Sequence, residues 1–130
     1  MDRFVSLVGD PHIGVFTRVF DDIAVVPPDA PEEFVARYEE ALKVIVVRTT
    51  IQRSPIIGSL LAGNKHGLVI TGMATRDEIN TLSEYRDLML LEEGMNAAGN
   101  IILANDHFAA VHPDIDEELM DALSDFLKVP

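Results

Sequence analysis

The feature that most constrains the fold of this sequence is an internal repeat. Three segments follow the same order of a glycine, an apolar stretch, a polar turn and a second apolar stretch. They are PHIGVFTRVFDDIAVVP, PIIGSLLAGNKHGLVIT and AAGNIILANDHFAAVHP. The leading glycines, Gly14, Gly58 and Gly99, are 44 and 41 residues apart. A repeat of this length predicts one supersecondary unit copied side by side along the chain.

Each copy predicts a β-hairpin. The polar turns are Asp21–Asp22, Gly63–Gly67 and Asn105–His107, and Asn, Asp and Gly tolerate the left-handed backbone of tight hairpin turns. The stretches that follow the turns are apolar or β-branched, as strands require. They cover residues 23–26, 68–70 and 108–111.

A helix is predicted after each hairpin, because an acceptor side chain precedes a glutamate with capping-box spacing. The pairs are Asp29 with Glu32, Thr75 with Glu78, and Asp114 with Glu117, where Asp116 is a rival cap. Apolar side chains then recur with helical spacing. They are Phe34, Val35, Tyr38 and Leu42 in the first helix, Ile79 and Leu82 in the shorter second, and Leu119, Met120, Leu123, Phe126 and Leu127 in the third.

A further strand is predicted before each hairpin, over residues 4–8, 44–50 and 88–92. The unit is then strand, hairpin and helix, with copies at about residues 3–43, 44–87 and 88–128. No linker separates the copies, so residues 1–130 are predicted to form one α/β domain of three tandem repeats. The pattern stops at Pro130, where a further strand would begin. We therefore expect open sheet edges and self-association through them.

The composition narrows the classes of function. A net charge of −12, from 22 acidic and 10 basic residues, argues against nucleic-acid binding over a broad face. It suits a basic protein partner, although acidity can also serve solubility alone. Because the chain has no cysteine, disulfides, Cys-bound zinc and thiol nucleophiles are excluded within it. The sequence shows neither a signal peptide nor an apolar run long enough to cross a membrane, which predicts a cytoplasmic protein.

Two long stretches carry a family resemblance. SPIIGSLLAGNKHGLVITG and NAAGNIILANDHFAAVHPDIDEELMDALSDFLKV resemble translation initiation factor 6 in its archaeal form. The resemblance implies a pentein-type α/β propeller of five ββαβ-like repeats, of which this chain matches the first three as an incomplete ring. It also implies a translation factor without catalytic residues or cofactor. Such factors bind the large ribosomal subunit, chiefly through the ribosomal protein uL14 near the sarcin–ricin loop, block premature joining of the small subunit and act in large-subunit maturation.

The repeat and the resemblance together predict binding residues. If the copies surround an axis, the residues after the leading glycines gather on one rim. Asn100 matches the family at its contact with the ribosomal protein, and its amide can donate and accept hydrogen bonds across an interface. The rim set comprises Gly14, Val15, Gly58, Ser59, Gly99 and Asn100. The alternatives are a local turn contact for Asn100 and simple packing for Val15.

The second hairpin turn supplies the other predicted binding residues, Asn64, Lys65 and His66. Turn chemistry is the competing explanation and accounts well for the Gly and Asn residues of this segment. No metal site is predicted, because His12, His66, His107 and His112 lack a metal-ligand spacing. The paired acidic residues are expected to lie mainly on solvated faces.

Two other functions remain open at this stage. One is a repeat-derived oligomeric binding module with no ribosomal role. The other is a fragment of a guanidine-modifying enzyme, since such enzymes share the pentein fold. Their chemistry needs a cysteine nucleophile, which residues 1–130 lack.

Overall fold

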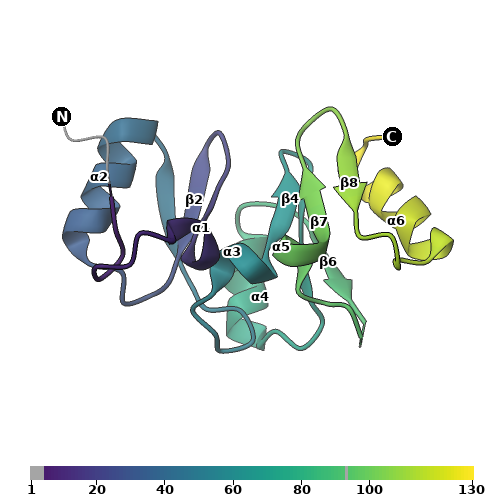
Figure 1. Ribbon diagram of the computed structural model, residues 1–130, viewed down its shortest axis with the longest axis horizontal. Coiled ribbons are helices and arrows are strands. Elements are labelled where there is room, and N and C mark those ends of the chain that lie inside the picture. The colour runs from purple at the N-terminus through teal and green to yellow at the C-terminus, as the bar shows by residue number, and fades with distance from the viewer. Residues whose placement is uncertain (1–4, 93) are drawn as a thin grey trace.

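The computed structural model describes residues 5–92 and 94–130, which form a mixed α/β fold with three small sheets (Figure 1). The first sheet has the order β1 (Arg18–Val19), β2 (Ile23–Val26), β3 (Ile45–Arg48). The second has the order β4 (Ala62–Asn64), β5 (Gly67–Thr71), β6 (Leu88–Leu91). The third pairs β7 (Ile102–Ala104) with β8 (Ala109–Val111). No closed barrel is present among the described residues.

Six helices accompany these sheets in the described part of the chain. The long ones are α2 (Glu32–Leu42), α4 (Arg76–Ser83) and α6 (Glu117–Leu127). The short ones have four residues each and are α1 (Ile13–Phe16), α3 (Ile57–Leu60) and α5 (Ala98–Ile101). Figure 1 shows the sheets side by side along the length of the molecule, with the short helices between them.

The three predicted hairpins are confirmed. In each, the strands before and after the polar turn pair antiparallel, with Arg18 opposite Val25, Ala62 opposite Val69, and Ile102 opposite Val111. The stretch after each leading glycine was expected to start the first strand. It instead completes a helical turn, and the strand begins afterwards.

The predicted capping signals are correct in part. Thr75 and Glu78 form the predicted capping box at the start of α4, where Thr75 Oγ1 accepts from the Glu78 amide at 3.2 Å. Asp116 caps α6 by accepting from the Leu119 amide at 2.7 Å, so the rival cap was right and the box led by Asp114 was wrong. The Asp29 box is wrong as well, because Pro31 holds the cap position of α2 and makes no side-chain cap bond.

The strand after each of α2 and α4 pairs with the hairpin that comes before the helix. β3 runs parallel to β2, with Val26 opposite Arg48, and β6 runs parallel to β5, with Ile70 opposite Leu90. The predicted grouping placed these strands with the hairpin that follows, so its boundaries at residues 43 and 87 each cut through a sheet.

The strand predicted over residues 4–8 is wrong for residues 5–8. Phe4 lies outside the described residues, and residues 5–8 form no strand. Instead Leu7 and Asp10 exchange two backbone hydrogen bonds of 2.9 Å around a tight turn. Ile51 and Ser54 close a matching turn after β3.

The apolar residues form three buried clusters. One lies against α2 and includes Phe34, Val35 and Tyr38. The second joins the first two sheets, and the third lies under α6. Two predicted stripe residues, Leu42 and Met120, are exposed. Leu42 is the last residue of α2, and Met120 falls at the edge of the apolar face of α6. No helix within the described residues is long and apolar enough to span a membrane.

Candidate functional site

The three leading glycines lie in α1, α3 and α5, which stack in that order because α1 contacts α3 and α3 contacts α5. A sequence pattern of four residues is too short to show helical periodicity, which is why these helices were not predicted. None of the three has a side-chain cap.

Close backbone approach explains two of the glycines. A Cβ on Gly58 would lie 2.6 Å from the Thr17 carbonyl oxygen and would clash more severely with the carbonyl oxygen of Gly14. A Cβ on Gly99 would meet the carbonyl group of Gly58 in the same way. Each short helix therefore packs its backbone directly against the next, and only glycine leaves room for this contact. Gly14 is first in the stack, and no atom of residues 5–92 or 94–130 lies within 4 Å of its Cβ position.

Arg18 links the start of β1 to α3 and to the residue that follows it. Its Nε donates to the Leu61 carbonyl oxygen at 3.0 Å, and its Nη2 donates to the carbonyl oxygen of Gly58. Both acceptors belong to the α3 region, while Arg18 itself begins β1. Burial lowers the pKa of this guanidinium, but an arginine stays charged in a folded protein. This role is not predictable from the sequence, because a lone arginine in a strand usually faces solvent.

The stack brings together the predicted rim residues Val15, Ser59 and Asn100. Each is the third residue of its short helix, and each amide donates to the carbonyl oxygen three residues earlier, at 2.9–3.1 Å. Val15 and Asn100 are exposed and Ser59 is half-buried. Three neighbouring backbone turns thus present an apolar group, a hydroxyl and an amide in series. Gly58, by contrast, is buried and Gly99 half-buried, so their main role is packing.

Asn64 has a structural role in the second hairpin turn. Its side chain is buried, and its Nδ2 donates to the carbonyl oxygens of Asn105 at 3.1 Å and Leu127 at 2.9 Å. Its Oδ1 accepts from the His66 amide at 2.9 Å. Turn chemistry therefore accounts for the Oδ1 bond, whereas both Nδ2 bonds link the turn to the third unit. Its neighbours differ, since Lys65 is exposed and His66 half-buried.

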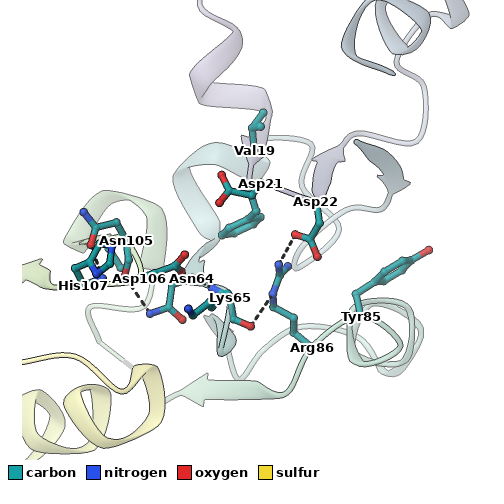
Figure 2. Close-up of a pocket in the computed structure, with 13 residues that line it drawn as sticks. Val19, Asp21, Asp22, Asn64, Lys65, Tyr85, Arg86, Asn105, Asp106 and His107 are labelled. Carbon is teal, nitrogen blue, oxygen red and sulfur yellow. Dashed lines mark hydrogen bonds and ion pairs between the residues drawn. The ribbon is translucent and has the colours of Figure 1, made fainter. Parts of the chain in front are cut away.

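The three hairpin turns surround a hollow of about 580 Å³ (Figure 2). Figure 2 shows side chains from each turn facing it, with the Arg86 side chain reaching toward Asp22. The Lys65 amide donates to Asp106 Oδ1 at 2.9 Å across the second and third turns. The lining of the hollow contains both acidic and basic side chains, so it carries no single sign of charge.

Arg86 joins the first two hairpin turns. Its Nη2 pairs with Asp22, its Nε donates to the Lys65 carbonyl oxygen at 3.3 Å, and its guanidinium lies 5.1 Å from the centre of the Phe20 ring. Only 8% of this side chain is exposed. Its Nη1 is buried without a hydrogen-bond partner among the described residues, where the Phe20 ring supplies a cation–π contact instead. Contacts of this kind were not visible in the sequence.

Glu78 fixes the turn between β3 and α3. Its carboxylate accepts from the Gln52 amide at 2.8 Å, the Arg53 amide at 2.9 Å and the Thr50 hydroxyl, besides closing its capping box. Burial alone would raise the pKa of this carboxyl, but these hydrogen bonds outweigh burial and lower it. The site is a structural clamp.

Metal binding finds no support in the part of the chain that the structure describes. No group of three His, Asp or Glu side chains there could hold a metal ion. The Nδ1 atom of His12 lies 2.9 Å from Oδ1 of Asp10 on an exposed turn. The bond to the backbone of His12 lowers the pKa of the Asp10 carboxyl.

Comparison with known proteins gives a consistent picture. The model of the eIF-6 family matches residues 2–130. A protein named translation initiation factor 6 from Methanospirillum hungatei is 87% identical over all 130 residues, which cover 59% of its own length. Proteins of the same name from Methanosphaerula palustris and Methanopyrus kandleri are 54% and 41% identical, over 59% and 56% of their lengths. The chain thus spans about three-fifths of the curated relatives it matches. All these names describe a translation factor and not an enzyme.

Proposed function

The chain belongs to the eIF-6 family, and from this premise we propose that it is part of a ribosome anti-association factor. The whole factor binds the large ribosomal subunit and prevents premature joining of the small subunit, and it acts in maturation of the large subunit. Its partner on the subunit is chiefly the ribosomal protein uL14, near the sarcin–ricin loop, and it works in the cytoplasm. As a member of a family of translation factors, the chain is not an enzyme.

The proposed architecture is three of the five ββαβ-like repeats of a pentein-type propeller, all within one domain. The recurring order of short helix, hairpin, long helix and parallel strand supports it. The stack of α1, α3 and α5 supports it further, since each glycine receives the carbonyl of the one before it. A closed ring extends this contact to Gly14, whose Cβ position has no neighbour within 4 Å among the described residues.

The proposed contact surface with the ribosomal protein is the rim of Val15, Ser59 and Asn100. The observation that carries it is the stacking of the three short helices, which sets these side chains at equivalent, neighbouring positions. A rigid backbone with short polar groups loses little side-chain entropy on docking. Lys65 and His66 are a second contact region of the proposal. The acidic chain suits a basic ribosomal protein better than ribosomal RNA.

Co-sedimentation with purified archaeal large subunits tests this proposal. We expect the chain to pellet with the subunits and Asn100→Arg to weaken binding about tenfold or more, as for a central interface residue. Asn80→Arg makes the same change at an exposed position of α4 and should bind like the parent chain. Equal binding of both variants would show that the rim is not the contact surface. If neither the chain nor a chain extended to the length of its relatives pellets, the ribosomal function is wrong.

A repeat-derived oligomeric module without a ribosomal role is the second candidate. Exposed large apolar side chains at both ends of the described structure favour self-association, among them Ile45 and Leu103 at 61% and 69% exposed. Analytical ultracentrifugation separates the two cases. A discrete oligomer that does not bind subunits supports the module, whereas subunit binding by the monomer rules it out.

A further inference from the structure

A hollow of about 500 Å³ lies where the start of α6 faces β6 and the loop after it, away from the rim and the hairpin turns. Its floor is apolar and includes Met89, Leu90, Met95 and Leu119. Leu90 and Met95 are 44% and 40% exposed, which is unusual for large apolar side chains that meet in one concave place.

The neighbouring seam between α4 and β3 shows why this hollow stays open. There Glu78, the third residue of α4, reaches across to Thr50 and to the turn at residues 51–54. The third residue of α6 is Leu119, an apolar side chain that cannot accept hydrogen bonds from a turn as Glu78 does. Leu91 likewise lines the α6 hollow at the position that Thr49 holds beside α4. The α4 hollow is smaller, about 360 Å³, and its lining is largely polar.

The charged side chains that surround the α6 hollow all have the same sign. Glu92, Asp114, Asp116 and Glu118 line it, and all four are exposed. No lysine or arginine occurs among the described residues that line this hollow. An apolar floor inside a ring of carboxylates is complementary to a segment with large apolar side chains flanked by cations. Methionine side chains on the floor can adapt to the shape of such a segment.

We propose that this hollow is a second docking site, which binds a basic amphipathic peptide segment of a partner protein. The segment places one or two aliphatic side chains against Leu90, Met95 and Leu119, and its Lys or Arg side chains pair with the surrounding carboxylates. A second copy of this chain fits poorly, because each copy carries a net charge of −12. The described residues that line this site do not include Val15, Ser59 or Asn100.

Fluorescence anisotropy with a labelled synthetic peptide of alternating leucine and lysine pairs tests the proposal. Binding is measured on the 130-residue chain and on a chain extended to the length of its relatives. Glu118→Lys should weaken binding about five- to tenfold, through loss of an attraction and gain of a repulsion. Leu90→Ser should weaken it about tenfold through loss of apolar contact. Both positions are exposed, and thermal melts establish that the variants fold.

The matched control is Asp77→Lys, because Asp77 holds in α4 the position that Glu118 holds in α6. It should change the peptide affinity less than about twofold. If Glu118→Lys and Asp77→Lys weaken binding equally, the peptide is attracted to the acidic chain in general, and the proposal is overturned. The same holds if a peptide with serine in place of leucine binds equally well. If the 130-residue chain binds the peptide and the extended chain does not, the added residues fill the hollow. If the chain dimerises and Leu90→Ser abolishes the dimer, a second copy fills it. Either result also overturns it.

Discussion

The stacked glycines predict that the same change to alanine alters the free energy of unfolding very differently at Gly58 and at Gly14, although the two positions are equivalent in the repeat. In Gly58→Ala, the new methyl group would lie 2.6 Å from the Thr17 carbonyl oxygen and 2.8 Å from the Gly14 carbonyl carbon. Ordinary contacts of a Cβ begin at 3.4 Å, and the Gly14 carbonyl oxygen is nearer still, so the two backbone segments must move apart by more than about 1 Å. Forced overpacking costs about 1–3 kcal/mol when side chains can adjust, and backbone atoms adjust less readily. We expect a loss of about 3 kcal/mol or more in the free energy of unfolding.

Gly14→Ala is the matched control. The same methyl group meets no atom within 4 Å in the part of the chain that the structure describes, and it lies in a helix of the same length. Alanine restricts the unfolded chain and favours the helix, so this variant should be neutral or more stable by up to about 1 kcal/mol. Gly99→Ala should resemble Gly58→Ala, because it meets the carbonyl of Gly58.

Urea denaturation followed by circular dichroism measures the difference. With a typical slope of about 2 kcal/mol per molar urea for a small domain, the midpoints of Gly58→Ala and Gly14→Ala should differ by about 1.5 M or more. Equal midpoints would refute the direct backbone contact between α1 and α3. In a chain extended to the length of its relatives, a closed ring predicts that Gly14→Ala becomes destabilising too, which tests the proposed propeller.

Three further changes probe the links between units, each by urea denaturation. Asn64→Ala removes both bonds to the third unit, including the one to Leu127, and should cost about 2–3 kcal/mol because it leaves buried acceptors unpaired. Arg86→Met keeps much of the packing but loses the Asp22 pair, and should cost about 1–2 kcal/mol. The folded pKa of Glu78 is lowered, so its stabilisation is present above the usual carboxyl pKa near 4.5 and disappears as the pH falls further. The free energy of unfolding of Glu78→Gln should therefore fall less steeply as the pH is lowered than that of the parent chain. An equal pH dependence in the two chains would contradict this.

The hairpins were predictable because their signals are local. A turn rich in Asn, Asp and Gly between two apolar runs specifies a hairpin almost regardless of its surroundings. The start of α4 was predictable for the same reason, since Thr75 and Glu78 satisfy each other within one turn. The start of α2 was not, because Pro31 fixes its own backbone angle and begins the helix without a side-chain cap.

The candidate site was predictable only in part. The repeat spacing brought Val15, Ser59 and Asn100 to equivalent positions, and the structure places them in neighbouring turns. The reason for the glycines was different from the one expected. A docking surface was predicted to need them, whereas Gly58 and Gly99 admit a neighbouring backbone. That need depends on contacts between residues about 40 positions apart, which no local pattern records.

The long-range roles of Arg18, Arg86 and Glu78 were missed for the same reason. Each side chain reaches from one unit into the next and bonds mainly to backbone groups or to a turn. Backbone acceptors and donors have no sequence signature, so such links are visible only in three dimensions.

The parallel strand that follows α2 has a consequence for how such a protein can be divided. β3 completes the sheet of the hairpin before it, so a cut between α2 and β3 strips the edge from β2. The turn at residues 51–54 carries the crossing to the next module, held there by one carboxylate. Grafts, permutations or deletions of whole modules should therefore be joined within that turn, where the exchange of one sheet for another disturbs the fewest strands.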